Sequence, residues 1–197
     1  MNSAADLPSI EAIVIGASAG GVEALLSILS PLRKGFKLPI IVVLHLPDER
    51  RSYLVEVFAR RVAMPVLEAR DKTLVEAGTL YFATPGYHLS VEHDRSFSLS
   101  LEARVHYSRP AIDYLFESAS DAYGSALAAV LLTGANRDGA RGLAQVKRRG
   151  GMTIVQDPDE AQVATMPQAA LDLHQPDHIL PICGIGRLLV ELERIAC

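Results

Sequence analysis

The sequence is poor in cysteine and in aromatic side chains. Its 197 residues include two cysteines, no tryptophan and 6% aromatic residues. Cys183 and Cys197 are too far apart for a C-x-x-C site, and a single pair makes no disulfide framework. A domain of this length buries roughly 70% of the surface that its unfolded chain exposes, so its core needs no disulfide or metal. We therefore expect a protein of a reducing compartment, the cytoplasm.

Two further absences exclude classes of partner. Positive charge is not in excess, because 19 basic residues stand against 23 acidic ones, which gives a formal charge of -4. Non-specific binding of nucleic acid therefore has no electrostatic support. The longest uncharged stretch runs from Ala122 to Asn136, about 15 residues, whereas a membrane-spanning helix needs 18 or more. We expect neither nucleic-acid binding nor insertion into a membrane.

The sequence does contain a regular alternation of two kinds of segment. Short apolar runs rich in β-branched residues, typical of buried parallel strands, alternate with segments whose apolar residues have helical spacing. The expected strands are residues 10–15, 38–46, 79–84, 126–132 and 152–156, and the expected helices are residues 20–30, 52–62, 112–122, 139–149 and 184–196. Residues 88–91 and 97–101 alternate around a polar turn like a hairpin.

This alternation predicts an α/β fold: a doubly wound, mainly parallel β-sheet flanked by helices, with an antiparallel β-hairpin extension. The sequence has no internal repeat, no low-complexity tract and no linker long enough to divide it. We therefore expect a short lead, residues 1–9, followed by one domain, residues 10–197.

A glycine-rich turn follows the first expected strand. Gly16-Ala17-Ser18-Ala19-Gly20 matches G-x-S-x-G, in which small neighbours allow a tight turn that projects the serine from the sheet. The helix that follows offers free backbone N–H groups, which suit a developing oxyanion. The alternatives are a phosphate-binding turn or simple packing. A dinucleotide site requires a glycine where Ser18 stands and an acidic residue where His45 stands, and no G-K-[ST] follows for a Walker loop.

Two other expected strands end in residues that can work with a serine. His45 follows the second strand directly, and Asp138 follows the strand at 126–132. Because the carboxyl ends of parallel strands share one edge of the sheet, the three side chains can meet there. Asp138 would then orient His45, and His45 would take the proton of Ser18. The alternatives are a structural histidine and an aspartate that caps the helix after it.

Other polar clusters give weaker evidence of a functional site. His174, Asp177 and His178 have the residue types of a metal site, but Pro176 interrupts the helix that would align them. We expect no metal and no cofactor. The basic pairs Arg50-Arg51 and Arg60-Arg61 are typical of solvated helix faces, which can attract an acidic partner if they lie beside the strand ends.

These motifs resemble the catalytic domain of the bacterial chemotaxis protein-glutamate methylesterase (CheB) family. The serine turn Ile15-Gly16-Ala17-Ser18-Ala19-Gly20-Gly21, the segment His45-Leu46-Pro47 and the aspartate loop Thr133-Gly134 with Asp138-Gly139-Ala140 carry the resemblance. Further segments similar to the family, in the family's order, are Ala83-Thr84-Pro85-Gly86-Tyr87-His88, Arg109-Pro110-Ala111-Ile112-Asp113-Tyr114-Leu115-Phe116, Gly150-Gly151-Met152-Thr153-Ile154-Val155-Gln156-Asp157 and Met166-Pro167-Gln168-Ala169-Ala170.

The resemblance implies a serine esterase. Ser18 would be the nucleophile, His45 the general base and then acid, and Asp138 the orienting carboxylate. We expect the backbone N–H groups of Ala19 and of the Ala135 region to bind the oxyanion. The implied substrates are γ-glutamyl methyl esters on the cytoplasmic helices of chemoreceptors, with deamidation of glutamines as a second activity in some members.

The sequence departs from the family pattern in two respects. Ala19 stands where the family usually has threonine, and Ala135-Asn136 replaces the end of a T-G-M-G sequence. We expect activity to be retained, with altered substrate fit or rate, because a backbone donor needs no particular side chain. The second departure is that the chain has no room for the usual N-terminal receiver domain. This predicts either a stand-alone esterase controlled by a separate receiver or regulatory protein, which we favour, or an excised domain of a longer protein.

Two other functions remain open from the sequence. A non-catalytic module of the same fold could bind receptor helices or signalling partners, and a small-molecule esterase could use the same residues. The distance from Ser18 to His45 and that from His45 to Asp138 discriminate between catalytic and non-catalytic readings, because a working triad approaches hydrogen-bond reach.

Overall fold

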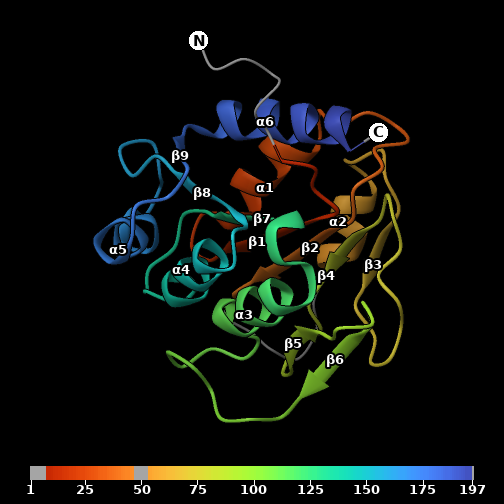
Figure 1. Ribbon diagram of the computed structural model, residues 1–197, viewed down its shortest axis with the longest axis horizontal. Coiled ribbons are helices and arrows are strands. Elements are labelled where there is room, and N and C mark those ends of the chain that lie inside the picture. Colours follow the sequence, from red (N-terminus) through yellow and green to blue (C-terminus); the bar gives the residue numbers. More distant parts are fainter. Residues whose placement is uncertain (1–7, 47–52, 197) are drawn as a thin grey trace.

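A seven-stranded, fully parallel sheet forms the centre of the computed structural model, which describes residues 8–46 and 53–196 (Figure 1). The strands lie in the order β3-β4-β2-β1-β7-β8-β9. Their bounds are β1 Ala12–Ala17, β2 Ile40–Leu44, β3 Val66–Glu68, β4 Leu80–Phe82, β7 Leu127–Leu131, β8 Met152–Gln156 and β9 His178–Leu180. All six pairings in this sheet are parallel.

The strand order reverses direction at β1, which pairs with β2 on one side and with β7 on the other. The chain first extends the sheet outward from β1 through β2 to β4, then returns to place β7, β8 and β9 on the opposite side. In open α/β sheets the crevice outside the carboxyl ends of the strands at such a reversal is the usual binding site. The carboxyl ends of β2, β1 and β7 therefore lie side by side there.

Helices cover both faces of the sheet, because alternate residues of the central strands point to opposite sides. Ile13 and Ile15 of β1 pack in one core with α1 Gly21–Leu29, α2 Leu54–Ala59 and α6 Ile182–Ile195. Ala12 and Val14 pack in a second core with α3 Ile112–Tyr123, α4 Ala140–Arg148 and α5 Thr165–Leu173. Figure 1 shows α1 and α6 on one side of the strands, and α3 and α4 on the other.

A two-stranded antiparallel hairpin, β5 His88–Val91 and β6 Phe97–Ser100, extends the second layer. Leu89, Val91 and Phe97 of this hairpin are buried in the same core as α3. The hydroxyl of Ser118 on α3 accepts the backbone N–H of Val91 at 3.1 Å. The hairpin and the loop that follows it are thus held against the helix that leads into the site.

The predicted fold class is confirmed: a parallel sheet with helices on both faces and an antiparallel hairpin. Each predicted element is present, with ends that differ by up to about three residues, as is usual for sequence-based boundaries. The predicted helix at 52–62 begins at a residue outside the described part of the chain. A short 3-10 turn, Gly124–Ala126, joins α3 to β7.

Three elements were not predicted: β3, β9 and α5. β3 and β9 have only three residues each and lie at the two edges of the sheet, where half-exposed side chains give no continuous apolar run. Pro167 lies in the first turn of α5, where proline is tolerated because that N–H has no partner within the helix. Across residues 8–46 and 53–196, no helix combines the length and the apolar character needed to cross a bilayer.

Candidate active site

The serine turn joins β1 to α1 at the carboxyl edge of the sheet. The Ser18 backbone N–H donates to the Thr133 carbonyl at 2.9 Å, and the Ser18 carbonyl accepts the Gly21 N–H at 2.7 Å. Gly20 has φ +80°, a left-handed conformation that favours glycine, and a Cβ there would lie 2.5 Å from the Gln162 Oε1. The left-handed conformation therefore favours glycine here, and Ser18 is left half-buried beside β7.

Thr133, at the end of β7, ties the turn to the neighbouring loops. Its hydroxyl donates to the Ala19 carbonyl at 2.9 Å and accepts the Val163 N–H at 2.9 Å. Its own N–H donates to the buried Gln156 Oε1 at 2.8 Å. One side chain thus fixes the turn, the aspartate loop and the segment before α5 relative to each other.

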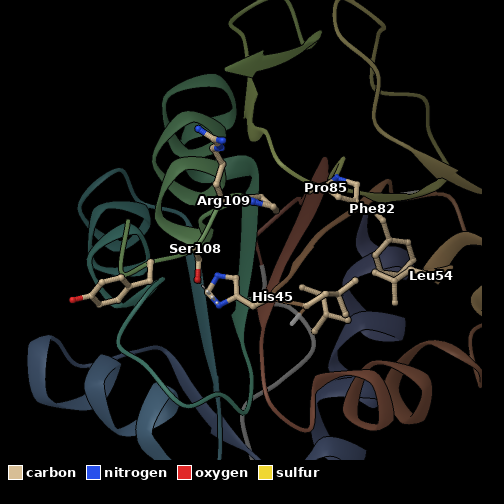
Figure 2. A pocket seen from close by; sticks show the side chains of 11 residues that line it. His45, Leu54, Phe82, Pro85, Ser108 and Arg109 are labelled. Carbon is tan, nitrogen blue, oxygen red and sulfur yellow. Dashed lines mark hydrogen bonds between the residues drawn. The ribbon is translucent and has the colours of Figure 1, made fainter. Parts of the chain in front are cut away.

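His45 and Asp138 meet at this edge, as the sequence analysis expects. The His45 Nε2 lies 2.8 Å from the Asp138 Oδ2, and the two side chains are 9% and 0% exposed. A carboxylate only accepts hydrogen bonds, so Nε2 carries the proton and Nδ1 is left as an acceptor. Nδ1 lies 3.4 Å from the hydroxyl of Ser108, which Figure 2 shows beside the imidazole ring.

Asp138 is held by the start of α3 rather than by the helix that follows it. Its Oδ2 accepts the Ile112 N–H at 2.7 Å and its Oδ1 accepts the Asp113 N–H at 3.0 Å. The N-cap of α4 is Gly139, which has no side chain to cap the helix. The alternative in which Asp138 caps the helix after it is therefore wrong, because the side chain accepts hydrogen bonds from the start of α3 and contacts His45.

Asp113, in turn, accepts hydrogen bonds from the start of α4. Its Oδ1 accepts the backbone N–H groups of Gly139 at 3.0 Å and Gly142 at 2.7 Å. Asp138 therefore caps α3, the helix that carries Asp113, and Asp113 caps α4, the helix that follows Asp138. We call this arrangement the reciprocal cap. Capping through space, between residues 25 positions apart, leaves no local sequence pattern, and sequence analysis did not find it.

The reciprocal cap places two carboxylates close together out of water. Burial, followed by the charge of Asp138, raises the pKa of Asp113 from 3.8 to about 6. The Gly142 N–H and the Arg141 guanidinium, whose Nε lies 3.8 Å from the Asp113 Oδ2, act in the opposite direction, while Glu117 adds to the increase. Ionised Asp113 thus costs folding free energy at neutral pH.

We expect Asp113→Asn to gain stability relative to wild type as pH rises. Because the folded-state pKa is raised, folded Asp113 binds a proton more tightly than the unfolded chain, so its contribution to stability declines between about pH 4 and pH 6. A shift from 3.8 to about 6 corresponds to about 3 kcal/mol. Asparagine keeps an oxygen for the Gly139 and Gly142 N–H groups. Denaturant unfolding of both proteins at about pH 4 and pH 7.5 measures the difference, and an equal difference at both pH values would contradict this account.

Ser18 and His45 line one open cleft of about 520 Å³, together with Ser108, Asn136 and Gln162. Among the described residues, no hydrogen bond joins the Ser18 side chain to His45. The hydroxyl that contacts the imidazole is that of Ser108, a residue that the sequence analysis did not single out although it directly precedes the segment Arg109–Phe116. Without substrate, catalytic hydrogen bonds are often long or poorly aligned, so a shared cleft is the relevant geometry.

Of the two expected oxyanion donors, Ala19 lines this cleft, and Ala135 directly precedes Asn136, which also lines it. Ala19 and Ala135 are exposed, and within the described chain neither backbone N–H has a hydrogen-bond acceptor. Gly134 brings the aspartate loop close, because a Cβ there would lie 3.0 Å from the Ser18 Cβ and 2.5 Å from the Met166 Cε. Two unpaired donors beside a serine are what an oxyanion requires.

The loop that carries Ser108 is positioned by His88. The imidazole Nε2 lies 3.0 Å from the Ala103 carbonyl, and Nδ1 accepts the Ala111 N–H at 3.1 Å. Burial lowers the pKa of His88, which keeps the ring neutral with one donor and one acceptor. The ring also stacks on Tyr114, with 4.0 Å between centroids. Both ends of the loop are thereby fixed against the hairpin.

Of the three residues His174, Asp177 and His178, Asp177 has another role. Asp177 accepts the N–H and the hydroxyl of Thr153, both at 2.9 Å, and pairs with Lys147. In the part of the chain that the structure describes, no three His, Cys, Asp or Glu side chains gather as a metal site. Pro47 and the basic pair at 50–51 lie outside the described residues.

Comparison with known proteins identifies a similar fold and similar sequences. The fold superposes on the crystal structure of the Thermotoga maritima CheB methylesterase catalytic domain with a TM-score of 0.88 and 33% identity, covering 94% of this chain and 100% of that one. The chain is 41% identical over 184 residues to a putative protein-glutamate methylesterase/protein-glutamine glutaminase of Leptospira interrogans, covering 93% of this chain and 95% of that protein. A Methanospirillum hungatei protein-glutamate methylesterase/protein-glutamine glutaminase 2 is 39% identical, over 93% of this chain and 53% of its own length.

The fold and these relatives show that the protein is a hydrolase built on a doubly wound parallel sheet. The CheB methylesterase family model matches residues 13–189, nearly the whole chain. The chain belongs to the CheB methylesterase family.

Proposed function

We propose that this methylesterase hydrolyses the γ-methyl esters of glutamate side chains in proteins, with Ser18 as nucleophile, His45 as general base and acid, and Asp138 as the orienting carboxylate. The observation that carries the proposal is the 2.8 Å contact between His45 and a fully buried Asp138, at a cleft that Ser18 also lines. Family membership supports the reaction, and the geometry supports the assignment of the three residues.

In the proposed mechanism, the Ser18 oxygen attacks the ester carbonyl while the His45 Nδ1 accepts its proton. Asp138 stabilises the imidazolium through Nε2–H. The N–H groups of Ala19 and Ala135 bind the oxyanion. The C–OCH₃ bond then breaks, and the methoxide oxygen takes the proton from Nδ1 and leaves as methanol. Water attacks the acyl-enzyme by the same route and releases glutamate. The two ring nitrogens thus exchange the roles that they have in the serine-protease template, where Nδ1 faces the aspartate.

The proposed substrates are methylated cytoplasmic helices of chemoreceptors or of a related chemosensory pathway, which places the enzyme in the cytoplasm. The related proteins are named as glutaminases as well as methylesterases, and the same attack on a glutamine side chain would release ammonia. We propose that residues 10–197 act as one catalytic domain after a short lead. The two cores packed on a single sheet support this division.

The test is methanol release from a methyl-esterified cytoplasmic fragment of the chemoreceptors of the source organism. We expect methanol from the esterified fragment, none from the unesterified one, and ammonia from the glutamine form if deamidation occurs. Binding of the fragment without methanol release would favour the non-catalytic module. Hydrolysis of free glutamate γ-methyl ester, with no action on the fragment, would favour a small-molecule esterase.

A further inference from the structure

A second, smaller cavity lies against His45 (Figure 2). Its volume is about 70 Å³. Figure 2 shows His45 and Ser108 at one end, and Phe82, Leu54 and Pro85 at the other. Phe82 and Leu54 are buried, with 2% and 8% of their surface exposed. The cavity therefore has a polar mouth beside the imidazole and an apolar interior.

Among the described residues that line the cavity, the one guanidinium is that of Arg109. It donates from Nη1 to the carbonyls of Leu101 and Glu102 at 3.1 and 3.2 Å, while its Nε is buried without a hydrogen-bond partner. Figure 2 shows that side chain directed away from Leu54 and Phe82. An apolar group is the occupant that such walls favour, because a buried polar group would lose its hydrogen bonds to water.

This cavity adjoins the cleft that holds Ser18. Four residues line both spaces: Leu44, His45, Leu46 and Ser108. The His45 Nδ1, which faces the Ser108 hydroxyl at 3.4 Å, lies at that boundary. In the proposed mechanism this nitrogen returns its proton to the leaving oxygen, so the leaving group must lie within its reach.

The volume sets the size of the occupant. An apolar cavity of about 150 Å³ holds a benzene ring, which has six carbon atoms. On that scale a space of about 70 Å³ holds roughly three non-hydrogen atoms. A methoxy group has two and an ethoxy group has three, whereas an n-butoxy group has five.

We propose that this cavity receives the alkyl group of the ester's leaving alcohol and thereby selects small alkyl esters. The inference rests on the proposed function. As the carbonyl–oxygen bond of the tetrahedral intermediate breaks, the alkyl group lies between Leu54 and Phe82, and its oxygen lies at the mouth, where the His45 Nδ1 donates the proton. The alcohol leaves, and the acyl group stays on Ser18.

The test uses a receptor fragment that carries methyl, ethyl, n-propyl or n-butyl esters on the same glutamates. All four esters give the same acyl-enzyme, so deacylation is identical and any preference is confined to acylation, measured as kcat/KM from alcohol release. A methylene that a pocket cannot accommodate typically changes kcat/KM by about 10- to 200-fold. We expect similar values for methyl and ethyl esters, and a value at least about tenfold lower for the n-butyl ester.

Two variants change the cavity in opposite directions. Leu54→Ala enlarges it, and we expect the n-butyl ester to gain at least about tenfold relative to the methyl ester. Ala83→Val, which adds two methyl groups to the wall, should lower the ethyl ester relative to the methyl ester. The matched control is Leu188→Ala on α6, which removes the same atoms from a residue of similar exposure, 7%, that lines neither space. It should leave the ratios unchanged.

The outcomes separate the two proposals. If the methyl ester is not hydrolysed, the proposed function fails, and the cavity assignment fails with it. If the methyl ester is hydrolysed but the n-butyl ester reacts equally fast, only the cavity assignment fails. An unchanged ester ratio in Leu54→Ala would also overturn the assignment, and Ala83→Val decides the question if Leu54→Ala does not fold.

Discussion

Replacement of Ser18 by alanine is expected to abolish methanol release from the methylated fragment. In this mechanism the serine oxygen forms the acyl bond, so alanine removes the atom that attacks the ester carbonyl. Loss of the nucleophile of a serine triad lowers kcat by about a million-fold in a well-studied protease. The fold should tolerate the change, because Ser18 contributes its backbone N–H and carbonyl to the turn and alanine keeps both.

The control for this result is Ser108→Ala. Ser108 is the serine whose hydroxyl lies 3.4 Å from the His45 Nδ1, so it is the rival nucleophile at this site. We expect Ser108→Ala to lose less than about tenfold in kcat, as for one neutral hydrogen bond. Near-normal methanol release by Ser18→Ala, combined with inactive Ser108→Ala, would reverse the assignment of the nucleophile.

Replacement of Asp138 by asparagine is expected to lower kcat by about 10,000-fold, as in the corresponding change of a serine protease. The asparagine amide can donate a hydrogen bond to the His45 Nε2, which moves the ring proton to Nδ1. A protonated Nδ1 cannot accept the proton of Ser18. The two conditions for this result are the close contact with His45 and the absence of water around a fully buried Asp138.

The same change should also weaken the fold. Asp138 accepts the N–H groups of Ile112 and Asp113 as well as that of His45, and an amide presents one oxygen where two now accept. An unpaired buried group costs about 1–3 kcal/mol. Steady-state kinetics at a temperature where both proteins are folded, together with thermal unfolding, separate the two effects.

Asp113→Asn is the matched control for Asp138→Asn. It makes the same chemical change on a neighbouring buried carboxylate whose Oδ1 accepts from Gly139 and Gly142, not from the imidazole. We expect it to retain most of the activity. If both asparagine variants lost activity equally, the role of Asp138 would be structural rather than a direct effect on His45.

The sequence predicted the central part of this fold because the buried strands are continuous apolar runs. β1, β2, β7 and β8 are buried throughout, and each was predicted. β3 and β9 were missed because short edge strands depend on a neighbour for their hydrogen bonds and do not carry such a pattern.

The sequence also indicated that Ser18, His45 and Asp138 share one edge, since each follows a parallel strand. It did not indicate which ring nitrogen faces Asp138, or that Ser108 contacts the other one. Ser108 is brought to His45 by a loop that His88 holds at Ala103 and Ala111. Contacts made through a loop between distant segments depend on the completed fold and not on spacing along the chain.

The reciprocal cap links the evolution of the catalytic site to that of the two helix starts. Asp138 orients the catalytic base and also begins α3, while Asp113 begins α4. A substitution that retunes the base at Asp138 therefore alters a helix start in the same step, and no neutral intermediate separates the two effects. A redesign of this enzyme for another ester can therefore change the residues that line the cleft, whereas a change at Asp138 alters the catalytic base and the start of α3 together.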